Sequence, residues 1–181
     1  VTGVQTCALP ISGFRMVGAH TDSPCLRLKP NPLVKKHGYL TAGVEVYGGV
    51  LLNPWFDRDL GIAGRVTVQD GKGRLASRLL DFDRAVAIIP SLAIHLDREA
   101  NQKRSVNNQT MLPPVLGLGG KAEFDIEQLL ADALKANGEF ARGDRIMDFE
   151  LSFYPCEGVA TLGLKEEFIA GARLDNLLSC F

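Results

Sequence analysis

The chain has 181 residues, a hydrophobic fraction of 46%, a charged fraction of 23% and a formal net charge of −1. This composition is typical of one ordinary globular domain or two small ones, and it offers no basic patch for nucleic acid or a membrane surface. No apolar run approaches the roughly 18 residues that a membrane helix needs. The four cysteines have no Cys-x-x-Cys spacing, which argues against a disulfide scaffold or zinc knuckle and favours a reduced, cytoplasmic setting.

The two ends of the chain do not resemble the ends of a folded domain. Residues 1–11, VTGVQTCALPI, have no helical or strand period and no signal-peptide pattern, and they read as a translated sequencing adapter. We therefore assign 1–12 to an artefactual or disordered leader, and we expect that deleting residues 1–11 leaves the melting temperature unchanged. Phe181 falls inside an apolar helical run without a C-cap signal, so we expect a fragment of a longer gene product.

The first predicted strand is the apolar run from Phe14 to Ala19, which stops abruptly at a histidine. Alternation over Cys25–Lys29 predicts a second, short strand. The segment 29–32, KPNP, should end that strand and mark a domain boundary.

From Leu33 onward, short β-type runs alternate with glycine turns, which is typical of a mainly β module. The segment 70–73, DGKG, predicts a hairpin turn between two of these runs. The runs are Tyr39–Tyr47, Gly61–Val68, Arg74–Leu80 and Ala85–Ile89.

Two helices and one more strand complete the predicted elements. Pro90–Glu99 predicts a short helix with proline in its first turn, followed by a polar loop over 102–109. Asp125–Asn137 predicts the clearest helix, because it has one apolar stripe, capping-box spacing from Asp125 to Gln128 and a glycine after its end. Alternation over 147–154 predicts a strand buried on one side. Its inward face should hold Met147, Phe149, Leu151 and Phe153.

The segment His20-Thr21-Asp22 follows the first predicted strand and is the first candidate site. Ligand sites in open α/β sheets lie at the carboxyl ends of strands, and residues two apart on an extended backbone point to the same side. His20 is therefore a candidate metal ligand, with Asp22 as the carboxylate that fixes its tautomer. A strand-end turn formed by Asp-Ser-Pro is the alternative.

Asp175 is the second candidate, because it precedes an apolar, helix-forming run. A plain helix N-cap is the alternative reading of this aspartate. A third charged cluster, Asp57-Arg58-Asp59, follows two aromatic residues. We interpret it as a structural ion-pair cluster, in which Arg58 serves both carboxylates, in preference to a catalytic carboxylate pair.

Four ordered blocks of the sequence together resemble the aspartyl aminopeptidases, a family of dinuclear zinc exopeptidases. The blocks are GAHTDSPCLRLK (18–29), GVEVYGGVLLNPWFDRDLGIAGRV (43–66), LAIHLDR (92–98) and the closing ARLDNLLSCF. The resemblance implies an α/β fold, namely a zinc-peptidase α/β domain interrupted by a β-rich oligomerisation domain. Residues 13–32 and 155–181 would belong to a partial peptidase domain, and 33–154 to the inserted domain.

The resemblance also implies roles for individual residues. His20 matches a terminal zinc ligand, Asp22 its supporting catalytic carboxylate, and Asp175 the carboxylate that bridges two zinc ions. His95 matches a histidine that reaches across a dimer to contact the substrate, whereas its own surroundings in the sequence favour a partly buried helix histidine. The general base and the remaining ligands would lie beyond residue 181.

The implied function is a zinc aminopeptidase that removes N-terminal Asp or Glu from peptides and acts as a homo-oligomer, without nucleic-acid or membrane partners. The 181-residue chain itself should be inactive, because it lacks half of the site. Two alternatives stay open: a non-catalytic oligomerisation or binding module, and a related zinc peptidase or deacylase of other specificity.

Overall fold

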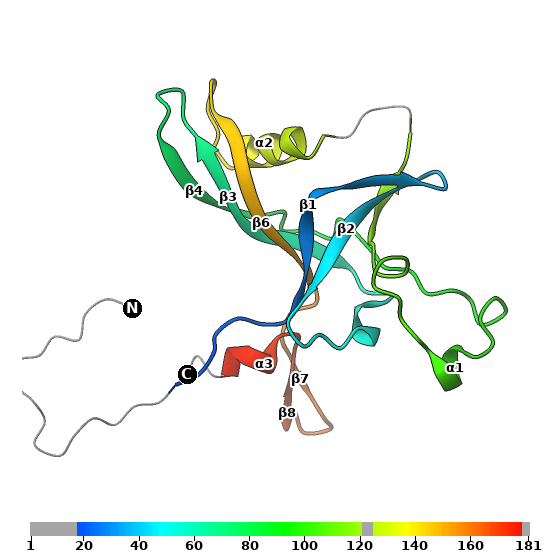
Figure 1. The fold of residues 1–181 in the computed structure, drawn as a ribbon. Coiled ribbons are helices and arrows are strands. Elements are labelled where there is room, and N and C mark those ends of the chain that lie inside the picture. The colour runs from blue at the N-terminus through cyan, green and yellow to red at the C-terminus, as the bar shows by residue number, and fades with distance from the viewer. Residues whose placement is uncertain (1–17, 121–124, 179–181) are drawn as a thin grey trace, which may run out of the picture.

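The computed structural model describes residues 18–120 and 125–178. A six-stranded antiparallel sheet dominates the structure, with the strand order β4-β3-β6-β1-β2-β5 (Figure 1). Its strands are β1 (Cys25–Lys36), β2 (Tyr39–Tyr47), β3 (Leu60–Gln69), β4 (Leu75–Asp81), β5 (Val115–Leu118) and β6 (Arg145–Pro155). The leader 1–12 and the chain end at Phe181 lie outside the described residues.

The smaller elements surround this sheet. A two-stranded sheet pairs β7 (Ala160–Leu162) with β8 (Phe168–Ala170). The helical elements are η1 (Asn53–Trp55), α1 (Ala100–Lys103), α2 (Ile126–Ala136) and α3 (Leu174–Leu177). Across the described ranges, no helix combines the length and the apolar character needed to cross a membrane.

The core lies on one face of the large sheet, because successive side chains of a strand point to opposite faces. Leu26 of β1, Val66 of β3 and Leu151 of β6 are each 0% exposed. Leu130 and Leu134 of α2 belong to the same buried cluster, so this helix covers part of that face. Burying each such side chain contributes roughly 1.5–3 kcal/mol, which makes this face the main source of stability.

Helix α2 and the hairpin between β3 and β4 confirm two predictions. Asp125 is the N-cap of α2, and its Oδ1 accepts a hydrogen bond from the Glu127 N–H at 2.9 Å. The second half of the predicted capping box is wrong, because the Gln128 amide donates to Asp132 at 2.7 Å. In the hairpin, the Gly73 N–H donates to the Asp70 carbonyl at 2.9 Å.

The predicted strand break at 29–32 is wrong, since β1 runs through these residues to Lys36. A register shift between Leu28 and Leu33 takes up the irregularity against β2. On its other side, β1 pairs with β6 only at Leu26 and Arg27, so no neighbour there requires an N–H from the two prolines. Proline is tolerated in strands at such edges and bulges.

The predicted helix Pro90–Glu99 is also wrong. Residues 94–96 form turns, and the α-helix in this part of the chain is α1, which begins at Ala100. Leu92, Ile94 and Leu96 are 64%, 45% and 75% exposed, so these residues have no apolar face to bury. Without a buried face, a short segment gains too little to hold a helix.

Three strand predictions need smaller corrections. Ala85–Ile89 forms isolated bridges to Phe56, Leu60 and Val115 in place of a regular strand. Met147 is 53% exposed because the pairing register of β6 shifts beside it, and Ile146 packs against the core instead. Of the run predicted over 14–19, residues 14–17 lie outside the described residues, and the last two residues are not in a strand.

Candidate metal centre

His20 and Asp22 lie on the exposed coil that precedes β1. His20 Nδ1 lies 3.1 Å from the carbonyl oxygen of Asp22 and 3.5 Å from its Oδ1. An imidazole that donates from Nδ1 keeps its lone pair on Nε2, the form in which histidine binds metals. Asp22 therefore supports His20 in this structure through its backbone carbonyl, and the carboxylate predicted for this role lies farther away, at 3.5 Å.

A tyrosine that the sequence did not single out holds this aspartate. The Tyr47 hydroxyl, at the end of β2, donates to Asp22 Oδ2 at 2.5 Å. This hydrogen bond is the largest cause that holds the pKa of Asp22 below its usual range, and it raises the pKa of Tyr47. The guanidinium of Arg27 lies 4.6 Å from the centroid of the Tyr47 ring. The missing signal was strand register, since Tyr47 pairs with Cys25, three positions after Asp22.

The segment around Asp175 lies beside this coil. The backbone N–H of Asn176 donates to Ser23 Oγ at 3.0 Å, which joins residues 153 positions apart. Figure 1 shows the blue coil before β1 approaching the red helix α3. Because Ser23 follows Asp22 and Asn176 follows Asp175, this bond brings the two predicted segments together.

Helix α3 does not use Asp175 as its N-cap. Arg173 occupies the N-cap position, and its side chain makes no capping hydrogen bond. Asp175 is exposed, whereas Asn176 is 3% exposed. The Asn176 Nδ2 has no hydrogen-bond partner among the described residues. The Asp175 carboxylate is therefore open to a ligand, next to a buried amide whose donor is unused within the described part of the chain.

A cavity of about 670 Å³ lies between this segment, the small sheet of β7 and β8, and residues 49–58. Its lining includes Asp175, Arg173, Arg58 and Glu157. The predicted ion-pair cluster of Arg58 with its neighbouring aspartates is wrong, because the Arg58 guanidinium pairs with the carboxylate of Glu157. Asp57 instead accepts a hydrogen bond from the Ser91 N–H at 2.8 Å, and this hydrogen bonding lowers the pKa of Asp57.

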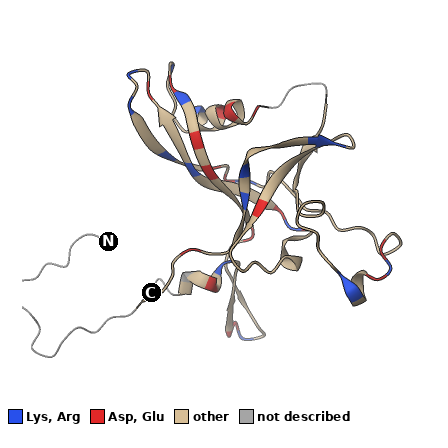
Figure 2. Cartoon of the chain, in the orientation of Figure 1, with Lys and Arg blue, Asp and Glu red and all other residues tan. Residues whose placement is uncertain are grey.

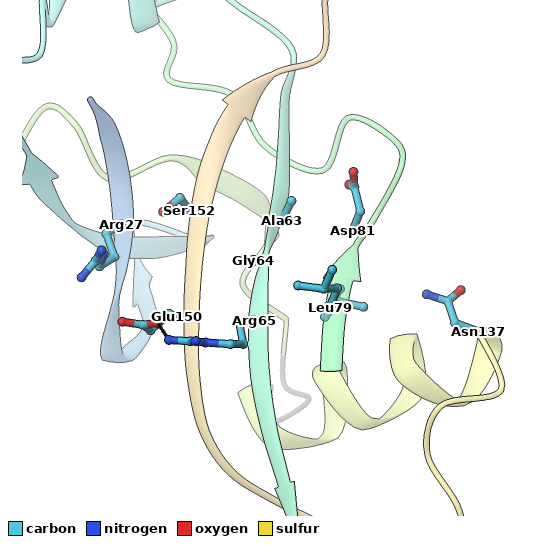
Figure 3. A pocket seen from close by; sticks show the side chains of 10 residues that line it. Arg27, Ala63, Gly64, Arg65, Leu79, Asp81, Asn137, Glu150 and Ser152 are labelled. Atoms are coloured by element: carbon cyan, nitrogen blue, oxygen red, sulfur yellow. Dashed lines mark hydrogen bonds and ion pairs between the residues drawn. The ribbon is translucent and has the colours of Figure 1, made fainter. Parts of the chain in front are cut away.

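A larger cavity of about 800 Å³ lies on the side of the sheet opposite the core and contains none of the predicted site residues. In Figure 3 the guanidinium of Arg65 points to the carboxylate of Glu150, with which it forms an ion pair across β3 and β6. Asp81 and Ser152 add further polar groups. We place the candidate site at the smaller cavity, because that cavity borders a residue with metal-ligand chemistry.

His95 lies apart from these groups, in an exposed turn between β4 and α1. It lines neither of the two cavities. Charges of both signs are distributed over the strands and helices, as Figure 2 shows. The candidate site at the coil of His20 and the start of α3 therefore does not include His95 in this structure.

The donors present suit zinc, which accepts imidazole nitrogen and carboxylate oxygen. They do not complete a site: within 18–120 and 125–178, no group of three or more His, Cys, Asp or Glu residues could hold an ion. A catalytic zinc usually has three protein ligands. His20 and Asp175 therefore fit zinc as part of a larger set of ligands.

Known proteins match the chain over most of its length. The family described as "Aminopeptidase I zinc metalloprotease (M18)" matches residues 4–181. A probable M18 family aminopeptidase 2 from Pseudomonas paraeruginosa is 55% identical over 169 residues, which are 93% of this chain and 39% of that protein. The chain thus spans 39% of the length of this curated relative.

Two solved structures have the same fold over this length. A chain in the cryo-EM structure of the Ape4 and Nbr1 complex is 40% identical with a TM-score of 0.78, and the match covers 87% of this chain and 33% of that one. The mApe1 structure from Chaetomium thermophilum is 32% identical with a TM-score of 0.74. That match covers 88% of this chain and 38% of the solved one.

Proposed function

Because the chain belongs to the aminopeptidase I zinc metalloprotease (M18) family, we propose that it is part of a zinc aminopeptidase that hydrolyses the first peptide bond of its substrates. The observation that supports this most directly is the hydrogen bond from Asn176 to Ser23. It joins the coil that presents an imidazole to the helix start that presents a carboxylate. These are two of the ligand types that zinc peptidases use.

Each residue has a distinct role in this proposal. His20 would hold zinc through Nε2, with Asp22 accepting from Nδ1–H to fix the ring and raise its basicity. Asp175 would bridge two ions. When bound, a zinc pair supplies Lewis-acid chemistry at the scissile carbonyl. The proposal names no residue of this chain as the base that accepts the proton of the attacking water.

We extend the proposal to substrates whose N-terminal residue is Asp or Glu. The sequence resemblance is its main support. The structure adds two guanidinium groups, Arg58 and Arg173, in the cavity that Asp175 lines. Arg58 already pairs with Glu157, which leaves Arg173 as the better candidate to attract an acidic side chain.

We also propose that residues 33–154 form an inserted oligomerisation domain and that residues 13–32 and 155–181 belong to the peptidase domain, with strand β1 crossing the boundary between residues 32 and 33.

We further propose that the protein works as a homo-oligomer in the cytoplasm, with His95 reaching the substrate of a neighbouring copy. Exposed leucines on both edge strands of the large sheet support the assembly, since such residues gain from being covered. They are Leu75 and Leu79 of β4 and Leu118 of β5. The free thiols of Cys25 and Cys156 suit a reducing compartment.

The test uses the full-length gene product with chromogenic Asp, Glu, Ala and Lys substrates. We expect turnover of the two acidic substrates, its loss on chelation and its return with added zinc. His20→Ala and Asp175→Ala should each abolish turnover. The matched controls are His37→Asn, at an exposed turn histidine, and Asp132→Ala, at an exposed helix aspartate, and neither should change it.

Two results would contradict this proposal. Turnover that persists after complete zinc removal would exclude the zinc mechanism. A full-length protein that binds zinc and yet cleaves none of the four substrates would favour a non-catalytic module or a zinc hydrolase of other specificity. The 181-residue chain should cleave none of them, because a missing base alone typically costs 10²–10⁴-fold in rate.

A further inference from the structure

We propose that Tyr47 is a positioning residue for the candidate metal centre, because its hydroxyl fixes the carboxylate of Asp22 that orients His20. The proposal rests on the proposed function and adds to it a residue from outside the His-x-Asp segment. Tyr47 also lies within 33–154, so it would connect the inserted domain to the site.

The geometry assigns the two oxygens of Asp22 different tasks. Oδ2 accepts from the Tyr47 hydroxyl at 2.5 Å, while Oδ1 lies 3.5 Å from His20 Nδ1. A carboxylate on an exposed coil can rotate freely unless one of its oxygens is held. His20 Nδ1 also lies 3.1 Å from the Asp22 carbonyl oxygen, so both acceptors near this nitrogen belong to Asp22. With Oδ2 fixed, Asp22 keeps a defined position beside the imidazole, and carboxylate or carbonyl partners of this kind set the tautomer and orientation of a ligating histidine.

Tyr47 is suited to this task because the sheet holds it. It is the last residue of β2 and pairs with Cys25 of β1, and the guanidinium of Arg27 covers its ring at 4.6 Å. By contrast, His20 and Asp22 have side chains that are 67% and 59% exposed and belong to no strand. Sites supported from strands are held more firmly than sites built on loops alone.

If Tyr47 mainly stabilised the fold, removing its hydroxyl would have a different effect. The hydroxyl–carboxylate contact is exposed, and such a hydrogen bond contributes little to folding. Removing the hydroxyl while keeping the ring should therefore leave the thermal midpoint unchanged. The effect should fall on zinc affinity instead, because residues that orient metal ligands typically change metal affinity 10–100-fold when they are mutated.

The test compares Tyr47→Phe with wild type in the full-length gene product, using zinc competition against a chromophoric chelator and the thermal midpoint of the zinc-free protein, since bound zinc would itself raise the midpoint. We expect a 10–100-fold loss of zinc affinity at an unchanged midpoint. Tyr39→Phe, at the other end of β2, is the matched control, since the structure gives its hydroxyl no hydrogen bond within the described residues, and its affinity should equal that of wild type. Asp22→Asn should weaken zinc as well, and Tyr47→Phe should add no further loss in that background.

Each remaining outcome would overturn the inference. Equal affinities for Tyr47→Phe and wild type would show that the hydroxyl does not position the site. Losses that add fully in the double variant would show that Tyr47 does not act through Asp22. A lowered thermal midpoint for Tyr47→Phe would assign the residue to fold stability. If wild type binds no zinc at all, while His20→Ala behaves like wild type, the proposed function itself fails.

Discussion

The large sheet and the candidate metal centre have opposite environments in this chain. In the sheet, Leu26 and Leu151 are 0% exposed and Phe153 is 1% exposed, within one continuous buried cluster. At the metal centre, the side chains of His20 and Asp22 are 67% and 59% exposed. The sheet is stabilised by many apolar contacts, whereas the coil at the site is held by a few hydrogen bonds.

This difference means that the sheet provides most of the stability, whereas the coil carries the candidate ligands. The bonds from Tyr47 to Asp22 and from Asn176 to Ser23 are few and lie on a coil, so they can orient the site but stabilise the fold less than the buried sheet does. Buried leucines contribute more each, and they act together. Changes in the sheet should therefore alter folding, and changes at the coil should alter ligand binding.

Hydrogen exchange gives the largest expected difference between the two regions. Amides in the middle of β6, such as those of Ser152 and Phe153, should exchange only on global unfolding, because β6 pairs there with both β3 and β1. Amides at residues 18–24 and 171–176 should exchange through local opening, at a free-energy cost lower by several kcal/mol. Exchange followed by mass spectrometry at peptide resolution measures both regions. Similar protection of the two regions would contradict the separation.

A core truncation should have the next largest effect. Leu151→Ala should lower the free energy of unfolding by about 2–5 kcal/mol, because it removes buried methyl groups from a 0% exposed side chain and leaves a cavity. Leu164→Ala is the matched control at a position that is 104% exposed, and its effect should stay within about 0.5 kcal/mol. Urea denaturation measures both variants. Comparable losses would show that burial in the sheet does not set the cost of removing a leucine side chain.

The elements that could be predicted from the sequence depend on local patterns. The alternating run Tyr39–Tyr47 has the same bounds as β2, and the stripe and caps of 125–137 predicted α2 to within a residue. The wrong predictions concern segments whose conformation depends on the strands with which they pair. The prolines at 30 and 32 are tolerated because β6 does not pair with that part of β1, and Met147 turns outward because of a register shift against β3. Neither cause is visible in a local pattern.

The residues of the candidate site also fall into those that a local motif predicts and those that only strand pairing places. His20, Asp22 and Asp175 could be proposed from short motifs and a family resemblance, because each motif contains its own chemistry. Tyr47 could not, since its place beside Asp22 follows from the register of β1 against β2. The pairing of Arg58 with Glu157 was missed for the same reason, because these residues are 99 positions apart.

The N-cap of α2 should have an intermediate effect. Asp125→Ala removes the acceptor for the Glu127 N–H and should lower the free energy of unfolding by about 1 kcal/mol. Asp125→Asn keeps an acceptor oxygen at the same place and should retain most of that stability. Thermal or urea denaturation of the two variants measures the difference. If both variants lost equally, the charge of Asp125 would matter more than its hydrogen bond.

The smallest expected effect is the pH dependence at the hairpin between β3 and β4. The carboxylate of Asp70 accepts from the N–H groups of Lys72 and Arg74, both at 2.9 Å, and from Arg74 Nε at 2.8 Å. These bonds, with the Arg74 backbone N–H as the largest cause, lower the pKa of Asp70. A pKa that is lower in the folded state means that the ionised carboxylate stabilises the fold at pH values above the unfolded pKa of about 3.9. This contribution should be lost as the pH falls through the folded pKa.

The variant Asp70→Asn isolates the contribution of the charge to stability, because the amide keeps an acceptor oxygen but not the charge. Wild type should exceed the variant in stability by a constant amount from pH 7 to about pH 5, and the gap should narrow as the pH falls below about 4. Urea denaturation across this range measures the gap, and a gap that stayed constant down to pH 2 would show that the charge of Asp70 does not contribute.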